Sequence, residues 1–283
     1  MKAAVLGSPV AHSLSPVLHS AAHAALGLDD WTYTRREVQA DELAGVLASL
    51  GPGWAGLSLT MPLKHAALSL AEELSPLARD VGAVNTLVPL GDPGAAGPVR
   101  WRGENTDVHG IVSALWEAGA ERASSAAVLG GGATATSALA ALRELGVREP
   151  VVHVRSPQRA AALHDVAARL GVEPHVEAWE RARGVLDADV VVSTVPAGVA
   201  DGLATAIAAP GAPRPRGVLL DVVYSPWPTE LARVWAERGG TVVGGFVMLL
   251  HQAGEQVHLM TGFPPPLEAM REAGEAALAA RGA

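Results

Sequence analysis

The sequence contains no cysteine. This absence excludes disulfide bonds, thiolate catalysis, iron–sulfur clusters and zinc sites built on cysteine. Basic residues are also scarce: 21 lysines and arginines stand against 29 aspartates and glutamates, which gives a formal net charge of −8 at pH 7. A surface that binds nucleic acid would show clustered lysine and arginine. We therefore expect small molecules as partners and no nucleic acid.

Long apolar runs are absent as well. The N-terminal stretch MKAAVLGSPV is interrupted at Gly7 and Pro9, too early for the apolar part of a signal peptide. No later stretch approaches the roughly 18 uninterrupted apolar residues of a membrane helix. We expect a cytoplasmic protein with no membrane segment, a location that the lack of cysteine permits. His19 and His23 lie four residues apart, but without an HExxH pattern we expect structural or solvated histidines and no metal site.

The chain has 283 residues, of which 49% are apolar, enough for one large domain or two ordinary ones. Short apolar runs alternate with helical patterns, and this alternation predicts an α/β fold with a parallel sheet. In the first part of the chain we expect a helix over 16–26 and another that begins after Thr60 and Pro62. Strands are expected at 2–7, 31–38 and 56–60, and a hairpin at 85–90 and 99–105.

The second part of the chain repeats one unit of strand and helix. A helix over 107–118 leads to a strand over 126–129, a glycine turn, and a helix whose inward face carries Ala135, Leu139 and Leu142. This is the pattern of a doubly wound nucleotide-binding domain. Four more strands rich in β-branched residues are expected within 150–156, 188–196, 216–224 and 240–245. A helix with one apolar face and a last helix near 268–281 follow, the apolar face comprising Phe246, Leu249, Leu250, Ala253 and Val257.

The glycine turn VLGGGATA has the context of a dinucleotide-binding turn, because it follows a strand and opens a helix. The spacing G-x-G-x-x-G/A fits as Gly130, Gly132 and Ala135, although a structural glycine turn would read the same way. After the next strand the chain reads HVRSPQR, with Arg155 and Arg159 where an acidic residue would bind the ribose of NAD. The pattern favours NADP, unless both arginines are simply solvated.

Four stretches outside this domain carry polar residues at turns and strand ends, GSPVAHSLSP, GLSLTMPLKHA, GAVNTLV and GENTDVHG. In the second of them, Lys64 falls in the first turn of a predicted helix, where the helix dipole disfavours a cation. A solvated lysine is one explanation, and the other polar residues also have structural ones. Ser13 and Ser15 would suit a helix cap, Asn85 a turn, and Asp107 an N-cap.

Taken together and in order, these stretches resemble the shikimate dehydrogenase family, and so do STVPAG, DVVYSPWPTEL and GGFVMLLHQAGEQVHLMTG further along. The resemblance implies reversible, NADPH-dependent reduction of 3-dehydroshikimate to shikimate, a step of chorismate and aromatic amino-acid biosynthesis. It implies a separate α/β substrate-binding domain at 1–106, rejoined by C-terminal helices at 246–283. It also implies a Rossmann-like doubly wound NADP-binding domain at 107–245, with the active site in the cleft between the two domains.

The resemblance also assigns roles to residues. Lys64 and Asp107 correspond to the catalytic pair, with Lys64 as general acid and base, because carbonyl reduction builds negative charge on oxygen that an ammonium can stabilise and protonate. Ser13 and Ser15 correspond to the serines that hold the substrate carboxylate. The further substrate contacts that the resemblance implies are Ser58, Thr60, Asn85, Tyr224 and Gln252. The implied cofactor contacts are Gly130, Gly131, Gly132, Ala133, Thr134, Arg155, Ser156, Arg159, Thr194, Val195, Gly245 and Met248.

The sequence departs from the family pattern at a few positions. Ser58 stands where the family usually has asparagine, so a shorter hydroxyl replaces an amide that both donates and accepts. In the phosphate turn, Ala133 replaces a glycine and Thr136 replaces an arginine, which removes one cation. The departures leave three alternatives open: a quinate-acting relative, an amino-shikimate enzyme, and a non-catalytic dinucleotide-binding homologue. The oligomeric state is expected to be a monomer or a homodimer.

Overall fold

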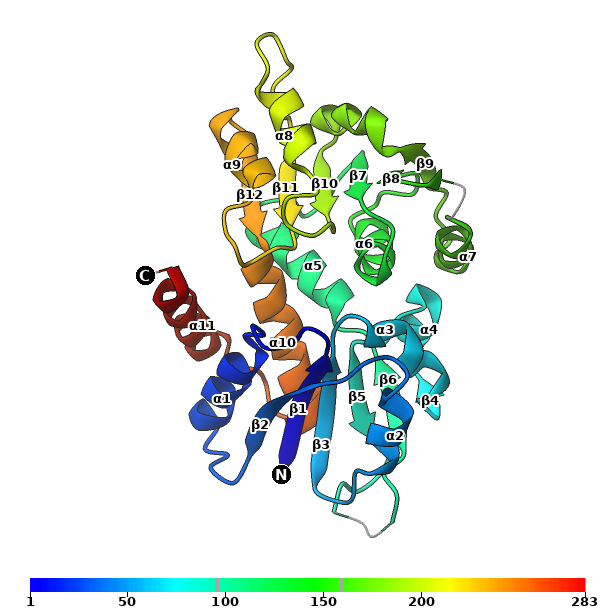
Figure 1. Cartoon of the computed structure of the whole chain (residues 1–283), viewed down its shortest axis with the longest axis vertical. Helices are drawn as coiled ribbons and strands as arrows, with labels where there is room; N and C mark the ends of the chain where they lie inside the picture. The colour runs from blue at the N-terminus through cyan, green and yellow to red at the C-terminus, as the bar shows by residue number, and fades with distance from the viewer. Residues whose placement is uncertain (95–96, 158–159, 283) are drawn as a thin grey trace. The chain divides into compact units, whose positions relative to one another are not determined.

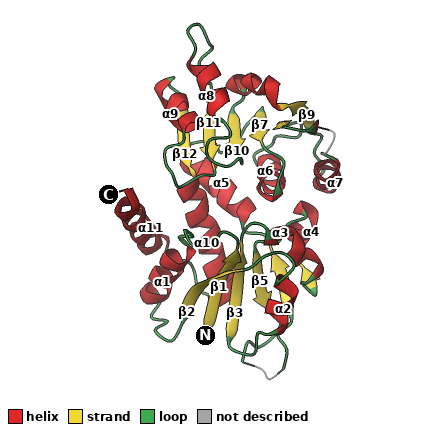
Figure 2. Cartoon of the chain, viewed as in Figure 1, coloured by secondary structure: helices red, strands yellow, loops and turns green. Residues whose placement is uncertain are grey.

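The computed structural model describes residues 1–94, 97–157 and 160–282, and these form two compact units, each built around one sheet (Figures 1 and 2). The first unit comprises Met1–Thr106 and Leu250–Ala283, and the second comprises Asp107–Leu249. The sequence predicted one domain boundary after residue 106 and a second at residue 246. The second lies four residues before Leu250, where the first unit resumes. None of the helices in the described part of the chain is long and apolar enough to cross a membrane.

The first unit contains a six-stranded sheet in the order β2-β1-β3-β5-β6-β4. Its strands are β1 (Lys2–Gly7), β2 (Thr32–Glu37), β3 (Trp54–Leu59), β4 (Glu73–Leu74), β5 (Thr86–Pro89) and β6 (Trp101–Glu104). Its helices are α1 (Ser15–Ala25), α2 (Leu43–Ala48), α3 (Leu63–Ala66), the 3₁₀ helix η1 (Ala67–Ser69), α4 (Pro76–Val81) and α11 (Leu267–Gly282). Helix α10 (Gly245–Thr261) starts in the second unit and ends in the first.

The position of each strand follows from its side chains. β1 is apolar from Ala3 to Leu6 and is buried throughout that run, as expected of an inner strand covered on both faces. β2 carries exposed charged and polar residues around one buried residue, Tyr33, and it forms an edge of the sheet. Charged side chains on an edge strand oppose pairing with other chains.

The expectation of a parallel sheet is correct for part of the first unit only. β1 pairs in parallel with both β2 and β3, whereas β5 runs antiparallel to β3 and β6. The reason is the hairpin of β5 and β6, which the sequence predicted and the structure confirms. A hairpin reverses the chain, so one of its two strands must oppose the direction of β3.

Helices cover both faces of this sheet. Leu43 and Val46 of α2, Leu63 of α3 and Ala78 of α4 pack with Leu57 of β3 in one apolar cluster. On the other face α10 approaches β3 closely, since a Cβ built on Gly56 would lie 2.7 Å from Cγ of Met260. On this side α1 and α11 lie side by side (Figure 1).

Helix α3 is shorter than the sequence pattern predicts. Leu63 and Ala67 are buried as expected, but the α-helix ends at Ala66 and continues as η1. The Lys64 carbonyl, which would accept a hydrogen bond from within a longer helix, accepts the backbone N–H of Val84 at 2.9 Å. At the start of the helix Thr60 acts through its carbonyl, which accepts the N–H of Leu63.

The second unit contains a fully parallel sheet in the order β12-β11-β10-β7-β8-β9. Numbered within the unit this order is 6-5-4-1-2-3, the order of a doubly wound dinucleotide-binding fold. Its strands are β7 (Ala126–Leu129), β8 (Val151–Val154), β9 (His175–Ala178), β10 (Val190–Ser193), β11 (Val218–Asp221) and β12 (Thr241–Gly244). Its helices are α5 (Asp107–Glu117), α6 (Ala133–Glu144), α7 (Ala161–Leu170), the 3₁₀ helix η3 (Trp179–Asp187), α8 (Asp201–Ala208) and α9 (Glu230–Glu237).

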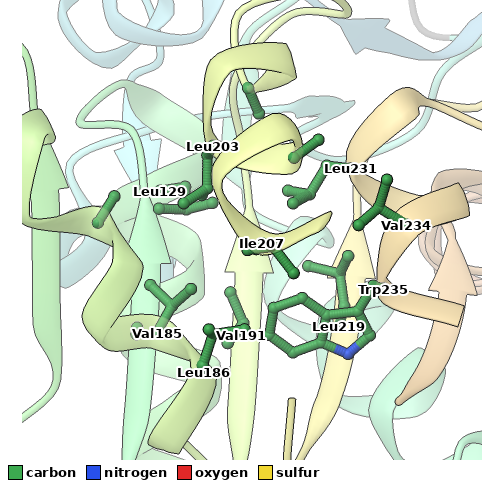
Figure 3. Close-up of a cluster of buried hydrophobic side chains, with 14 of the residues drawn as sticks. Leu129, Val185, Leu186, Val191, Leu203, Ile207, Leu219, Leu231, Val234 and Trp235 are labelled. Carbon is green, nitrogen blue, oxygen red and sulfur yellow. The ribbon is translucent and has the colours of Figure 1, made fainter. Parts of the chain in front are cut away.

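The core of the second unit explains why its inner strands are so apolar. One face of β7, β10 and β11 packs against η3, α8 and α9, and Figure 3 shows Leu203 and Ile207 of α8 above Val191. Trp235 of α9 is fully buried in this cluster, and its Nε1 donates to the Gly217 carbonyl at 3.2 Å. Residues that alternate with these along the same strands, such as Val190, are also fully buried. Both faces of the sheet are therefore covered.

Candidate functional site

The polar stretches of the first unit meet at one edge of its sheet because of strand direction. The segments with Ser13, Ser15, Thr60 and Lys64 follow the carboxyl ends of β1 and β3, which are parallel neighbours. Asn85 immediately precedes β5, and the antiparallel direction of β5 puts its start at that same edge. The chain also leaves the sheet there at the end of β6, which is antiparallel to β5.

The segments after β1 and β3 are held together by backbone hydrogen bonds. The N–H of Thr60 donates to the Leu6 carbonyl at 2.9 Å, and the N–H of Ser8 donates to the Met61 carbonyl at 2.8 Å. Gly7 lies so close to Thr60 that an added Cβ would come within 2.2 Å of the threonine Cγ2. A side chain at position 7 would therefore push the two segments apart.

Ser13 and Ser15 lie together at the start of α1. The Ser13 hydroxyl donates to Ser15 Oγ at 3.2 Å, and the backbone N–H of Ser15 donates to Ser13 Oγ at the same distance. The structural alternative was a helix cap, but the N-cap position of α1 is Leu14, which makes no side-chain capping hydrogen bond. The pair offers hydroxyl groups that suit a carboxylate.

Lys64 is half-buried in α3, and the backbone ties it to the segment that carries Asn85. The Val84 N–H donates to the Lys64 carbonyl, and the Asn85 carbonyl accepts the Leu59 N–H at 2.7 Å. The helix start that holds Lys64 is thus fixed against the same edge of the sheet. Asp107, buried at the first position of α5, is the residue that directly follows the first unit.

Asn85 is the centre of a buried polar cluster. Its Oδ1 accepts the backbone N–H of Thr106 at 2.8 Å and the hydroxyl of Thr86 at 2.9 Å. Its Nδ2 donates to Thr106 Oγ1 at 2.9 Å and to Gln252 Oε1 at 3.4 Å. The structure therefore brings together Asn85 and Gln252, which are 167 residues apart in the sequence.

Ser58 lies in the same unit and is also buried, with only 4% of its surface exposed. Its Oγ accepts the Tyr33 hydroxyl at 2.6 Å, and its own hydroxyl donates to Gln256 Oε1 at 2.8 Å. The same Gln256 oxygen lies 3.3 Å from Nε2 of His19, whose ring stacks on Tyr33 with the ring centroids 3.9 Å apart. The hydroxyl at position 58 thus has partners within the protein, which an asparagine of different length and chemistry would not match atom for atom.

The histidine beside this cluster is strongly perturbed. Complete burial, and then the nearby His23, lower the pKa of His19 to about 3, although the bond to Gln256 acts in the opposite direction. Burial also raises the pKa of Tyr33, so its hydroxyl stays protonated and remains a donor to Ser58. His19 is therefore neutral at pH 7 and donates to Gln256 from Nε2.

This perturbation predicts a pH dependence of stability. Between pH 6.5 and about 3 the unfolded chain protonates His19 and the folded chain does not, so the free energy of unfolding falls as the pH falls. We expect a loss of up to about 1.4 kcal/mol per pH unit from this residue. His19→Phe can keep a ring against Tyr33. Between pH 7.0 and 5.5 it is expected to reduce the change of the free energy of unfolding with pH, because up to one proton fewer is bound on unfolding. Urea unfolding at both pH values measures it, and equal slopes for the two proteins would contradict the assignment.

In the second unit, the glycine turn follows β7 and opens α6 as predicted. Gly130 has a φ of +112°, and an added Cβ would lie 2.5 Å from Thr194 Oγ1, so this position requires glycine. Thr194 follows β10 and donates from its hydroxyl to the Leu129 carbonyl at 2.8 Å. At Gly132, the N-cap of α6, an added Cβ would meet no atom within 4 Å. A bare turn at a helix N-terminus suits a phosphate group.

The other predicted cofactor residues occupy strand ends in this unit. β8 and β10 flank β7 in the parallel sheet, so Arg155 and Ser156 after β8 lie at the same edge as the glycine turn. Arg155 is exposed, whereas Arg159 lies outside the described residues. Thr136, in the place of the family's arginine, donates its hydroxyl to the Ala133 carbonyl at 2.8 Å. The remaining predicted cofactor contacts lie at the ends of elements: Ala133 and Thr134 begin α6, Val195 follows Thr194, and Gly245 and Met248 lie in the first turn of α10. Tyr224, a predicted substrate contact, is half-buried after β11.

Sequence reasoning missed several members of the first cluster, Tyr33, Thr86, Thr106 and Gln256, and it named His19 only as a structural or solvated histidine. A signal for Gln256 was present, because it lies one helical turn after Gln252 and beside the apolar face of the same predicted helix. No comparable signal marked Tyr33, whose partner Ser58 is on a strand two positions away in the sheet. Among the described residues there is no group of three or more histidine, aspartate or glutamate side chains that could hold a metal ion.

Comparison with known proteins gives matches over nearly the whole chain. The family model described as the shikimate dehydrogenase substrate binding domain matches residues 5–87, and the one described as the shikimate 5′-dehydrogenase C-terminal domain matches residues 245–273. A shikimate dehydrogenase (NADP(+)) of Synechococcus sp. (strain JA-3-3Ab) is 37% identical over 286 residues, which cover 97% of this chain and 93% of the relative.

Solved structures agree with the sequence matches. Shikimate dehydrogenase of Mycobacterium tuberculosis is 46% identical, with a TM-score of 0.85 and coverage of 97% of this chain and 99% of that chain. Shikimate 5-dehydrogenase of Thermus thermophilus, solved in complex with NADP(H) and shikimate, is 33% identical, with a TM-score of 0.81 and coverage of 98% and 99%.

Proposed function

The chain belongs to the shikimate dehydrogenase family, and from that premise we propose that it reduces 3-dehydroshikimate to shikimate with NADPH, reversibly, as an oxidoreductase of aromatic amino-acid biosynthesis. The observation that carries the proposal is the presence of Ser13, Ser15, Lys64 and Asn85 on segments at one edge of one sheet, with Gln252 of α10 hydrogen-bonded to Asn85. Carboxylate, carbonyl and hydroxyl groups of a small ring would each find a suitable partner among these side chains.

In this proposal the first unit holds the substrate. Ser13 and Ser15 bind its carboxylate, and Thr60, Asn85 and Gln252 bind ring oxygens. Tyr224 stays a predicted substrate contact, as the resemblance implies. Ser58 is hydrogen-bonded to Tyr33 and Gln256, which are not predicted substrate contacts, and this supports a role behind those contacts.

We propose Lys64 as the general acid and Asp107 as its partner. As the carbonyl carbon of 3-dehydroshikimate accepts a hydride, negative charge develops on its oxygen. The Lys64 ammonium stabilises that charge and transfers one proton from Nζ to the oxygen, which yields the hydroxyl of shikimate. In the oxidation of shikimate the neutral amine takes the proton back. Asp107 holds the lysine in place and accepts a hydrogen bond from a substrate hydroxyl.

The residues of the second unit fit an NADP cofactor. The glycine turn at the N-terminus of α6 suits a pyrophosphate, since an added Cβ at Gly132, the N-cap of that helix, would meet no atom within 4 Å. Arg155 supplies a cation after β8, where the adenosine ribose lies in this fold class. When bound, the reduced nicotinamide supplies the hydride. We propose the second unit as the NADP-binding domain on these grounds.

A substitution of Arg155 tests the cofactor assignment. Arg155→Ser is expected to raise KM for NADPH about tenfold, because one charge-assisted hydrogen bond to the 2′-phosphate is lost. KM for NADH, which has no such phosphate, is expected to change less than twofold. Arg143→Ser removes another exposed arginine from the last turn of α6 and serves as the control. An equal rise of KM for both cofactors would contradict the role of Arg155.

One assay separates the proposed function from its alternatives. The purified chain is mixed with 3-dehydroshikimate or 3-dehydroquinate, each with NADPH or NADH, and the loss of the 340 nm absorbance of the reduced cofactor is followed. The proposal expects the highest kcat/KM with 3-dehydroshikimate and NADPH. Faster turnover of 3-dehydroquinate would establish the quinate alternative, and no turnover beside measurable NADPH binding would establish a non-catalytic homologue.

A further inference from the structure

The buried hydrogen bonds of the first unit form one continuous chain with a fixed direction. The Tyr33 hydroxyl donates to Ser58, and the Ser58 hydroxyl donates to Oε1 of Gln256. Nε2 of Gln256 then donates to Thr86 Oγ1 at 2.9 Å, and the Thr86 hydroxyl donates to Oδ1 of Asn85 at 2.9 Å. Each hydroxyl in the chain has one hydrogen, so each link determines where the next hydrogen points.

Gln256 determines the direction at the middle of the chain. Its oxygen accepts from Ser58 and faces Nε2 of His19, while its nitrogen donates to Thr86 and, at 3.3 Å, to the Asn85 carbonyl. Turning this amide over would place its nitrogen against two donors. Because Gln256 is only 1% exposed, water cannot replace the lost partners.

The end of the chain is the pair of amides that the proposed function assigns to substrate binding. Because the Thr86 hydroxyl and the Thr106 N–H both donate to Asn85 Oδ1, the Asn85 nitrogen faces Thr106 Oγ1 and Gln252 Oε1. The Thr106 hydroxyl also donates to Gln252 Oε1, at 3.4 Å. The oxygen and nitrogen of an amide leave the same carbon in different directions. Because the Gln252 oxygen points to Asn85 and Thr106, its nitrogen points away from them.

We propose that Gln256 and Thr86 are positioning residues that fix the orientation of the Asn85 amide and, through it, determine which end of the Gln252 amide faces the substrate. The proposal rests on the proposed function, in which these two amides bind ring oxygens. With its oxygen held by Thr106 and Asn85, Gln252 directs its amide nitrogen to the other side, and a nitrogen donor on that side favours a ligand oxygen that accepts a hydrogen bond. The network therefore acts on substrate selection through Asn85 and Gln252 and does not touch the reacting atoms.

Two substitutions of Thr86 test the chain of hydrogen bonds at a single atom, the Thr86 hydroxyl oxygen. Thr86→Val keeps the shape of this fully buried side chain and removes the hydroxyl, whereas Thr86→Ser keeps the hydroxyl. We expect Thr86→Val to raise KM for shikimate about tenfold, with kcat within threefold and KM for NADP⁺ within twofold. Thr86→Ser is expected to restore KM to within threefold of the wild-type value.

Two further variants separate positioning from general destabilisation. Val257→Ala removes buried apolar atoms next to Gln256 without touching the hydrogen-bond chain. At a thermal midpoint similar to that of Thr86→Val, its KM values are expected to stay at the wild-type level. Gln256→Glu keeps the oxygen that accepts from Ser58 but removes the donor to Thr86, so it is expected to raise KM for shikimate as Thr86→Val does. A rise of KM in Val257→Ala equal to that in Thr86→Val would overturn the proposal.

A measurement without substrate keeps this test independent of the proposed function. The side-chain amide hydrogens of Asn85, identified by comparison of NMR spectra with Asn85→Asp, are expected to exchange with water at least about tenfold faster in Thr86→Val than in wild type or Thr86→Ser. Equal exchange in all three proteins would overturn the positioning role. A wild-type chain without turnover would overturn the proposed function, while the exchange rates would still decide whether Thr86 holds Asn85.

Discussion

Lys64→Ala is expected to lower kcat for the reduction of 3-dehydroshikimate by about 10²–10⁴-fold, the range of general acid catalysis by a positioned side chain. In the proposed mechanism the substitution removes both the proton donor and the positive charge that stabilises the developing oxyanion. KM for NADPH is expected to change little, because the predicted cofactor contacts lie in the second unit. Steady-state kinetics with each substrate varied in turn measures both quantities.

The sequence offers a matched control for this experiment. Lys64 and Lys2 are the only lysines in the chain, and Lys2 is exposed at the start of β1. Lys2→Ala removes the same charge and is expected to leave kcat within twofold of wild type. A Lys64→Ala protein that folds normally and keeps more than a tenth of the wild-type kcat would contradict the assignment of Lys64 as the general acid.

Trp235→Ala is expected to have the largest effect on stability, a loss of about 3–5 kcal/mol in the free energy of unfolding. Trp235 is fully buried between α9 and the sheet of the second unit, and Figure 3 shows its ring beside Leu219 and Leu186. The substitution leaves a cavity and leaves the Gly217 carbonyl without its indole donor. Urea unfolding followed by circular dichroism, with extrapolation to water, measures the loss.

An exposed tryptophan of the same unit provides the comparison. Trp116 of α5 is 55% exposed, and Trp116→Ala is expected to change the free energy of unfolding by less than about 0.5 kcal/mol. Trp235→Phe should lie between the two, since it keeps an aromatic ring but loses volume and the N–H. Similar losses for Trp235→Ala and Trp116→Ala would show that the cluster around Trp235 does not hold this unit together.

Most of the order of strands and helices was predictable because hydrophobic periodicity is a local property, although the short strands β4 and β9 were not predicted. The strand at 126–129, the glycine turn and the inward residues Ala135, Leu139 and Leu142 are all found as predicted. The two short helices at Leu43–Ala48 and Pro76–Val81 were not predicted, since six residues give too few turns for a periodic pattern. The early end of α3 depends on a hydrogen bond from Val84, a tertiary contact that no local pattern reports.

From the sequence, only those residues of the candidate site that belong to family motifs could be predicted. The resemblance marked Asn85 and Gln252, and the structure shows that they share a hydrogen bond. It did not mark Tyr33, because the bond to Ser58 crosses β1 and depends on how three strands are aligned. In the sequence, Ser58 was a departure from the family's asparagine that left the substrate preference open. The structure gives it two partners, which explains how a smaller residue is accommodated there.

The most direct test of the proposed function follows the hydride itself. The chain is incubated with 3-dehydroshikimate and NADPH that carries deuterium at the transferred position, and the product is analysed by mass spectrometry. The proposed function predicts shikimate that is one mass unit heavier than the unlabelled compound, with one molecule formed for each cofactor oxidised. Cofactor oxidation without labelled shikimate, or no oxidation by a folded protein that binds NADPH, would contradict it.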